Sequence, residues 1–154
     1  MQHTYDVQIT WTGSRSVGTT SYTSYDRDHT IVIVGKPEIP GSSDIAFRGN
    51  ARRYSPEEML VASLSACHML WYLHLCADNG IVVLAYEDHA SGKMTEDGER
   101  GAFEEVVLHP SVSISAESSR QKAIALHEEA HRRCYIANSV KFPVRNIADV
   151  RGAT

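Results

Sequence analysis

Apolar and polar residues alternate with the two-residue period of a β-strand near the start of the chain. In residues 5–11 every second side chain is large and apolar, and Thr12-Gly13 ends the pattern. Residues 19–25 are rich in β-branched and aromatic residues, and residues 30–34 repeat that composition up to a glycine. Three strands are therefore predicted in the first third of the chain.

The pattern then changes to a long, nearly continuous apolar run within residues 54–80. Ser55 is placed to cap a helix, Pro56 suits its first turn, and Glu58 follows Ser55 by three residues, as in a capping box. Asn79-Gly80 is typical of a helix C-terminus. Because the run is apolar almost all round, we expect this central helix to be buried rather than amphipathic.

Residues 35–54, which precede the central helix, show no periodicity and are rich in Pro, Gly and Ser. A structureless connection of this length is usually functional or disordered. It brings three arginines, Arg48, Arg52 and Arg53, to the start of the central helix.

Beyond the central helix, residues 81–91 and 103–115 are predicted strands that pair as a hairpin around the turn signal Glu96-Asp97-Gly98. Pro110 is expected to bulge the second of these strands or to place it at a sheet edge. Residues 118–134 predict a second helix. A last strand, interrupted by Pro143, is predicted over residues 140–150.

This order of strands and helices predicts the fold class. Hairpin-connected strands around two helices indicate an α+β fold with a mostly antiparallel sheet and two core helices. The length of 154 residues and the absence of repeats or low-complexity segments indicate a single domain over residues 1–154.

Composition narrows the function classes. The net charge is −4 and the charges are mixed along the chain, which argues against nucleic-acid or membrane-surface binding. The N-terminus lacks the basic-then-apolar pattern of an export signal, and the apolar run of the central helix is short for a membrane span. Three widely spaced cysteines do not form a secreted disulfide framework, so a reducing, cytoplasmic location is expected.

The cysteines are the first candidates for chemistry. Cys67 and Cys76 are nine residues apart on the central helix and so face opposite ways, which favours a packing role for Cys76. Cys134 lies on the inward face of the second helix, with His127 and His131. Since packed helix axes lie about 8–10 Å apart, Cys67 and Cys134 can meet as a redox pair. Inert core packing of Cys67 is the alternative.

Neither thiol of this pair is activated by its local sequence. Cys134 ends a helix, where the helix dipole disfavours a thiolate, and Cys67 lies mid-helix among apolar residues. Cys67 therefore needs a cation from elsewhere, and the arginine-bearing loop upstream is the expected source.

Two motifs carry a resemblance that covers nearly the whole chain. SPEEMLVASLSACH around Cys67, followed by AHRRCYIANSV around Cys134, is similar to the OsmC/organic hydroperoxide resistance (Ohr) family of thiol peroxidases. The resemblance implies the OsmC-like fold and an intertwined homodimer with two active sites at its interface. It also implies Cys67 as the peroxidatic cysteine, Cys134 as the resolving cysteine, and an assisting arginine and glutamate.

The resemblance assigns the other site residues less directly. Glu57 matches the family's glutamate, and the arginine is either Arg48, in the loop before the helix, or Arg15, in the first strand region. Arg15 and Trp71 are expected to bind substrate. His68 and the aromatic Trp71-Tyr72 replace the smaller aliphatic residues of the best-known members, which indicates a subgroup with another substrate or with weak peroxidase activity.

Helix geometry places a condition on Glu57. Ten residues separate it from Cys67, or about 15 Å along one helix with an angular offset of about 80°. Glu57 therefore cannot reach the Cys67 sulfur of its own chain. If the family's assignment holds, Glu57 serves Cys67 of a partner subunit across a two-fold axis.

A competing motif lies on the second helix. His127-Glu128-Glu129-Ala130-His131 matches H-E-x-x-H, the pattern of zinc hydrolases in which the glutamate is the base. Cys134 shares that helix face, yet no convincing conventional third ligand follows downstream. So short a pattern is more often formed by histidines that are hydrogen-bonded in the core or face solvent than by zinc ligands.

These observations predict a cytoplasmic peroxidase that reduces organic hydroperoxides without a metal, flavin or nucleotide cofactor. Cys67 becomes a sulfenic acid, condenses with Cys134 to a disulfide, and is recycled by a dithiol, for which the resemblance indicates a lipoyl-type reductant. The alternatives are an OsmC-like stress protein with little peroxidase activity that binds an apolar ligand, and the zinc hydrolase.

Overall fold

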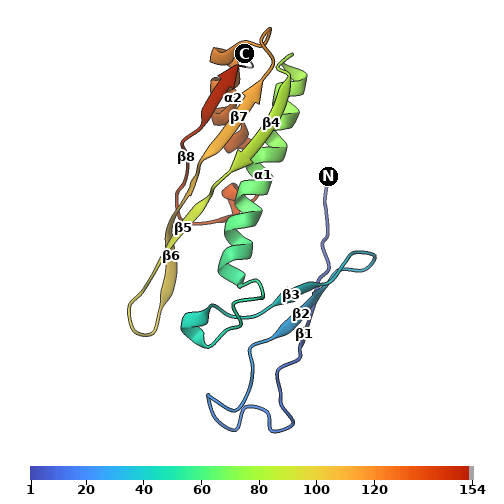
Figure 1. The fold of residues 1–154 in the computed structure, drawn as a ribbon, viewed down its shortest axis with the longest axis vertical. Coiled ribbons are helices and arrows are strands. Elements are labelled where there is room, and N and C mark those ends of the chain that lie inside the picture. Colours follow the sequence, from blue (N-terminus) through green and yellow to red (C-terminus); the bar gives the residue numbers. More distant parts are fainter. Residues whose placement is uncertain (153–154) are drawn as a thin grey trace. The chain divides into compact units, whose positions relative to one another are not determined.

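The computed structural model describes residues 1–152 (Figure 1). The chain divides into two compact units, Met1–Leu60 and Val61–Thr154. The division falls inside a single helix and does not decide whether residues 1–154 form one domain, so that expectation stays a prediction.

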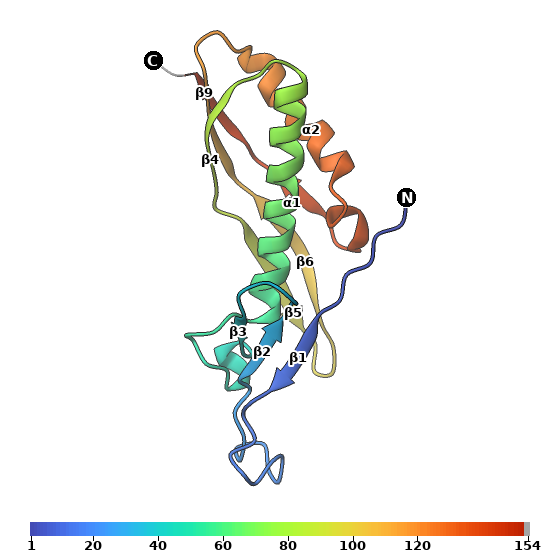
Figure 2. The ribbon, with the colours of Figure 1, turned by 90° about the vertical axis from the view of Figure 1, so that its right-hand side faces the viewer.

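The N-terminal unit contains one antiparallel sheet of order β1-β2-β3 (Figure 2). Its strands are β1 (Gln8–Trp11), β2 (His29–Val32) and β3 (Ile39–Gly41), which confirms the first and third predicted strands. β3 lies within the stretch predicted to be structureless. It contains Pro40, and its edge position explains how the sheet accommodates a residue without an N–H.

The predicted strand over residues 19–25 is wrong, because this segment forms turns and bends. The Ser24 hydroxyl donates to the carbonyl oxygens of Gly18 and Ser21, and Gly18 has a positive φ of 62°. Short polar side chains that bond to nearby backbone compete with strand pairing, and here they prevail over β-propensity.

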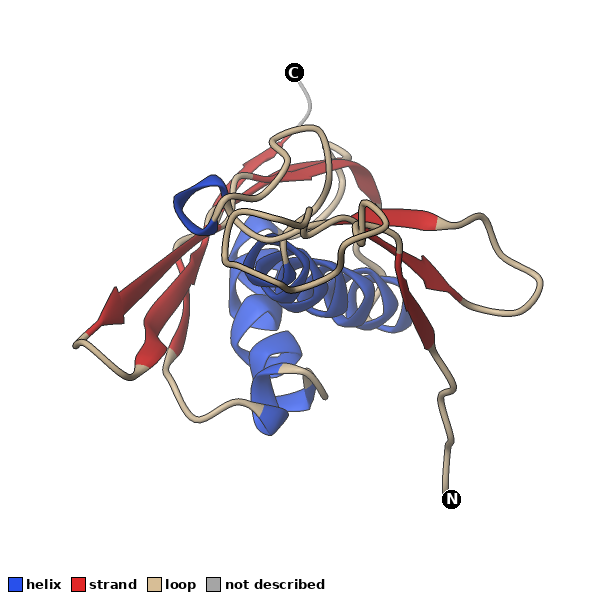
Figure 3. Ribbon diagram, turned by 90° about the horizontal axis from the view of Figure 1, so that it is seen from below, coloured by secondary structure: helices blue, strands red, loops and turns tan. Residues whose placement is uncertain are grey.

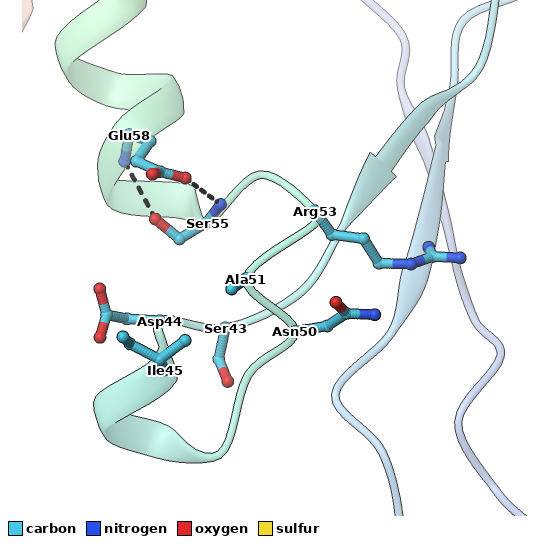
Figure 4. Close-up of a pocket in the computed structure, with 8 residues that line it drawn as sticks. All are labelled: Ser43, Asp44, Ile45, Asn50, Ala51, Arg53, Ser55 and Glu58. Atoms are coloured by element: carbon cyan, nitrogen blue, oxygen red, sulfur yellow. Dashed lines mark hydrogen bonds between the residues drawn. The ribbon is translucent and has the colours of Figure 1, made fainter.

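Helix α1 (Pro56–Asp78) begins and ends as its sequence predicts. The Glu58 N–H donates to Ser55 Oγ, and Glu58 Oε2 accepts from the Ser55 N–H at 2.9 Å, so the capping box is present (Figure 4). At the other end Gly80 has φ 71°, and the Ile81 N–H donates back to the Cys76 carbonyl. Both ends of the helix are therefore specified locally.

The prediction that α1 is buried holds for only part of its surface. Its buried residues are Leu64, His68, Tyr72, Leu75 and Cys76, whereas Leu70 is 62% exposed. By length and composition α1 is the one helix within residues 1–152 that meets the requirements for a membrane span, a test that core helices also pass. A single chain thus leaves one apolar side of α1 uncovered.

The second unit contains two three-stranded sheets. One has the order β4-β7-β9, from β4 (Val83–Asp88), β7 (Pro110–Ile114) and β9 (Asp149–Gly152). The other has the order β5-β6-β8, from β5 (Ser91–Glu96), β6 (Gly101–Leu108) and β8 (Val144–Asn146). The pairs β4–β7 and β5–β6 are antiparallel, and β6–β8 and β7–β9 are parallel.

The predicted hairpin is present, but each of its long strands is divided in two. β4 and β5 pair with β7 and β6 respectively, and the break falls at His109-Pro110. Asp88 Oδ1 accepts the His109 N–H at 2.7 Å, which draws this N–H away from the ladder, and Pro110 has none to offer. Residues 140–150 are likewise divided, between β8 and β9.

Helix α2 (Arg120–Arg133) begins at Ser119, whose Oγ accepts the Lys122 N–H, as predicted for a helix in this segment. Together with the part of α1 in this unit, it lies over one face of the β4-β7-β9 sheet (Figures 1 and 2). Figure 3 shows the two helices beside each other. The core between them and the sheet includes Tyr72, Leu75, Cys76, Val112, Ile114, Ala123, Leu126, Ala130 and Val150. The predicted α+β class, with two core helices and mostly antiparallel pairing, is confirmed.

Candidate functional site

The structure brings together the two cysteines that the sequence predicts to meet. Cys67 lies on α1, Cys134 lies at the C-terminal end of α2, and the two thiols are close enough for Cys67 to raise the pKa of Cys134. Both are free thiols. Cys67 is partly exposed, whereas Cys134 is 1% exposed and accepts the Ala137 N–H at 3.4 Å.

Burial separates the chemistry of the two thiols. It raises the pKa of Cys134 to about 11, the hydrogen bond from the Ala137 N–H acts in the opposite direction, and the contact with Cys67 raises the pKa further. Cys134 is thus protonated at neutral pH and shielded from solvent. Cys67 is the accessible member of the pair, so it is the thiol that can attack a substrate arriving from solvent.

Cys76 has the surroundings of a packing residue, as its position on α1 predicts. It is 1% exposed within the hydrophobic core, where burial raises its pKa although its hydrogen bond with Tyr72 acts in the opposite direction. A buried thiol with a raised pKa is a poor nucleophile. Cys76 therefore serves as the matched control for Cys67 in the experiments below.

Aromatic side chains adjoin the thiol pair in sequence and in space. Trp71 follows Cys67 by one helical turn, and Tyr135 follows Cys134 directly. Their rings meet edge to face at 5.5 Å, and the Arg133 guanidinium lies 5.8 Å from the Trp71 ring. Trp71, which the sequence predicts to bind substrate, thus forms an apolar surface with Tyr135. The role of Tyr135 was not predicted from the sequence.

A buried polar cluster joins α1, α2 and β8. His68 Nε2 and His127 Nδ1 share a hydrogen bond of 3.0 Å, and Asn146 Nδ2 lies 2.8 Å from the same His68 nitrogen. The Tyr72 ring stacks on His127 with centroids 3.8 Å apart. His68 is 1% and His127 5% exposed. Sequence spacing does not predict this cluster. Its one signal in the sequence is an inward-facing histidine on each of the two predicted core helices.

This arrangement bears on the H-E-x-x-H motif. His127 Nδ1 faces His68, its Nε2 is buried, Glu128 is exposed, and His131 is partly exposed. Within residues 1–152 no three His, Cys, Asp or Glu side chains are placed to hold a metal ion. The residues present therefore do not fit a catalytic zinc site, which needs three protein ligands.

The predicted arginine and glutamate belong to the N-terminal unit. Arg15 is exposed and is held by Asp26, to which Nε donates at 2.7 Å. This pairing raises the pKa of Arg15 and lowers that of Asp26. Arg48 caps the short helix η1 (Ile45–Phe47) with φ 65°, and its side chain has no hydrogen-bond or ion-pair partner in the described part of the chain. Of the two candidates, Arg48 is the one with a free guanidinium.

Glu57 lies in the first turn of α1 and is partly exposed. Its Oε2 atom is nevertheless buried, without a hydrogen-bond partner among residues 1–152. A buried carboxylate oxygen without a partner costs free energy, and such groups in proteins are usually paired. A donor for Glu57 is therefore expected from outside the described residues of this chain.

A polar pocket of about 170 Å³ lies at the start of α1 in the same unit (Figure 4). Its lining groups already have partners: Ser55 and Glu58 bond to each other, and Asp44 caps η1. Arg53 also lines the pocket, and its guanidinium pairs with Asp28 at 3.0 Å. No cysteine is among the residues that line the pocket.

The buried histidines predict an acid-sensitive fold. Burial lowers the pKa of His68 to about 4 and that of His127 to about 3, from ordinary values near 6.5. The unfolded chain therefore takes up these protons first as the pH falls, and stability present above about pH 6.5 is lost progressively towards pH 4. The free energy of unfolding should fall by on the order of 2 kcal/mol for each imidazole between pH 7 and pH 5.

Urea unfolding at pH 7 and pH 5 measures this loss of stability. Both pH values lie above the range in which most carboxylates titrate. The double variant His68→Gln/His127→Asn should lose most of the pH dependence. His74→Gln changes an exposed histidine of the same helix and should retain it. A double variant as acid-sensitive as the wild-type chain would contradict the assignment.

Comparison with known proteins places the chain in a family. Residues 49–146, which include both helices and both thiols of the pair, match the family described as OsmC-like protein. No curated protein matches the chain. An OsmC-like protein of unknown function from Vibrio cholerae has 29% identity and a TM-score of 0.85, over 97% of this chain and 100% of that one.

Two more distant solved structures share the fold. The organic hydroperoxide resistance protein OsmC of Legionella pneumophila has 17% identity and a TM-score of 0.70, over 97% of this chain and 98% of that chain. The organic hydroperoxide resistance protein OhrB of Bacillus subtilis has 18% identity and a TM-score of 0.61, with the same coverage. Since the family match covers most of the chain and the likeness of fold nearly all of it, this chain belongs to the OsmC-like protein family.

Proposed function

We propose that this chain is a thiol peroxidase for organic hydroperoxides, in which Cys67 attacks the peroxide and Cys134 resolves the product. One observation carries the proposal: a partly exposed thiol on α1 and a buried thiol at the end of α2 lie close enough to interact. The names of the Legionella and Bacillus relatives, both organic hydroperoxide resistance proteins, support the substrate class. Reduced thiols are needed for turnover, which agrees with a cytoplasmic location.

The reaction balances without a metal or organic cofactor. The Cys67 thiolate attacks one peroxide oxygen, the O–O bond breaks, and the departing alkoxide takes a proton to leave as an alcohol. Cys67 is then a sulfenic acid. The Cys134 sulfur attacks the Cys67 sulfur, water leaves with the thiol proton, and a disulfide forms. An external dithiol, for which we propose a lipoyl-type compound, restores both thiols.

The surroundings of Cys67 favour an organic peroxide over hydrogen peroxide. Trp71 and Tyr135 provide apolar surface beside the pair, suited to an alkyl or aryl group. A cation near the Cys67 sulfur would stabilise the thiolate and polarise the peroxide oxygen. We assign this role to Arg48 rather than Arg15, because Arg15 is engaged by Asp26.

The active form in this proposal is a homodimer. The uncovered apolar side of α1, with Leu70 62% exposed, suits an obligate dimer core. Glu57, which cannot reach Cys67 of its own chain, has a buried carboxylate oxygen without a partner among residues 1–152. Both features are accounted for if Glu57 of one chain orients an arginine beside Cys67 of the other, in two equivalent sites.

Mixing two inactive variants tests this shared site. A heterodimer of Glu57→Ala and Cys67→Ser chains has one site with both defects and one site with neither. Each heterodimer should therefore show about half of the normal activity, and an equimolar mixture after random exchange about a quarter. Mixing Cys67→Ser with Cys134→Ser is the matched control: these two residues act within one chain, so no site is repaired. Exchange without recovery in the first mixture, or a monomer at micromolar concentration, would refute the shared site.

The function itself is tested by cumene hydroperoxide consumption with dihydrolipoamide as reductant. Turnover is expected, and it should be faster than with hydrogen peroxide. An OsmC-like protein that only binds an apolar ligand in the same surroundings would bind cumyl alcohol without consuming the peroxide. A zinc hydrolase would carry stoichiometric zinc that is lost on His127→Ala, whereas a chelator should leave the peroxidase activity unchanged.

A further inference from the structure

Two buried imidazoles, His68 and His127, and the half-buried amide of Asn146 link three elements of the second unit, α1, α2 and β8. His68 Nε2, His127 Nδ1 and Asn146 Nδ2 lie 2.8–3.4 Å from one another, so the three side chains share one set of hydrogen bonds. Burial lowers the pKa of both imidazoles, so both are neutral at pH 7. The stacked Tyr72 ring fixes His127 from the side, and the Tyr72 hydroxyl donates to the Ala123 carbonyl at 3.1 Å.

Stability does not explain this cluster. His68 Nδ1, His127 Nε2 and Asn146 Oδ1 are all buried without a hydrogen-bond partner in the part of the chain that the structure describes. Each such atom carries a desolvation penalty, and apolar side chains of similar size often replace buried polar pairs at no cost or with a gain in stability. A fold selected for stability alone would place apolar residues here, so the cluster calls for a role in function.

Its location indicates that role. His68 directly follows Cys67 on α1, and His127 lies two helical turns before Cys134 on α2. α2 ends at Arg133, and Cys134 is its C-cap, whose N–H donates to the His131 carbonyl, so the place of this cysteine follows the end of the helix. The direction and depth of α2 against α1 therefore decide whether the Cys134 sulfur reaches Cys67.

We propose that His68, His127 and Asn146 are positioning residues that hold α2 against α1 and thereby keep Cys134 in contact with Cys67. This inference builds on the proposed function, in which that contact becomes the disulfide. Directional hydrogen bonds between α1, α2 and β8 fix one arrangement of the helices, whereas apolar side chains would pack in several. Two titratable groups act on the pKa of His68 besides burial: His131 on α2, which lowers it, and Asp88 on β4, which raises it.

The reduction potential of the Cys67–Cys134 pair tests the proposal without relying on peroxidase activity. Thiols held in contact form a disulfide more readily, and the potential is correspondingly more negative. In His68→Leu/His127→Leu the equilibrium constant for disulfide formation should fall about tenfold, which makes the potential about 30 mV less negative. Equilibration with dithiothreitol buffers, followed by alkylation and mass spectrometry, measures it. The melting temperature shows whether this variant is folded, and it should fall modestly because the Asn146 amide loses its histidine partners.

The matched variant is His68→Gln/His127→Asn, whose amide ends occupy the places of the facing ring nitrogens, and it should restore the wild-type potential. His74→Gln on the exposed side of α1 should have no effect. Equal shifts in the leucine and amide variants, or a wild-type potential in a folded leucine variant, would overturn the proposal. If the leucine variant does not fold, Asn146→Ala decides: a potential about 10–15 mV less negative supports positioning, and an unchanged one refutes it. A missing peroxidase activity with these shifts intact would count against the proposed function alone.

Discussion

Cys67→Ser is expected to lower the rate of cumene hydroperoxide consumption by on the order of a thousandfold or more, because a serine hydroxyl cannot replace a thiolate as the nucleophile. Neither remaining thiol can take over. Cys134 is buried with its pKa raised to about 11, and Cys76 is buried in the hydrophobic core with its pKa also raised. The measurement is the steady-state rate with dihydrolipoamide in excess.

Cys76→Ser is the control for this loss, since it changes a thiol to a hydroxyl on the same helix. Its effect on the rate should be less than about twofold, provided that the variant is folded, although a buried hydroxyl is expected to reduce stability. Comparable losses of activity in folded Cys76→Ser and Cys67→Ser would contradict the assignment of Cys67 as the nucleophile.

Cys134→Ser is expected to consume about one equivalent of peroxide per chain and then to stop or slow severely. Cys67 still becomes a sulfenic acid in this variant, but no second thiol is positioned to condense with it. Excess peroxide should then oxidise Cys67 further to a sulfinic acid, which dithiols do not reduce. Intact-mass measurement detects the addition of two oxygen atoms to the chain.

The wild-type chain treated in the same way provides the comparison, because its sulfenic acid is captured as a disulfide before a second oxidation. Sustained turnover by Cys134→Ser at the wild-type rate would contradict a resolving role for Cys134. It would show instead that the external dithiol attacks the Cys67 sulfenic acid directly.

Local signals predicted the helices well and the strands incompletely. The capping box at Ser55 and the Gly80 terminus are features of adjacent residues, so both ends of α1 followed from the sequence. Residues 19–25 have strand composition, but their serines bond to the local backbone. Likewise, the division of the two long strands depends on the hydrogen bond from the His109 N–H to Asp88, which lies 21 residues away in the sequence. Contacts of this kind leave no periodicity in the sequence.

The candidate site was predictable to the same extent. Helix periodicity placed Cys67 and Cys134 on inward faces, and the structure brings them together. The His68–His127 pair joins residues 59 positions apart, and Asn146 comes from a short strand, so no spacing rule connects them. In the proposed homodimer the cation beside Cys67 depends on how the two chains assemble, which the sequence of one chain does not determine.

The most direct test of the central claim is the state of the two cysteines after one equivalent of cumene hydroperoxide. Reduced wild-type chain is mixed with the peroxide, quenched with an alkylating reagent, digested without reductant and analysed by mass spectrometry. The proposed mechanism predicts a peptide pair linked through Cys67 and Cys134 in nearly every chain, with Cys76 alkylated. Cys67 recovered as an alkylated thiol, or a disulfide that includes Cys76, would contradict it.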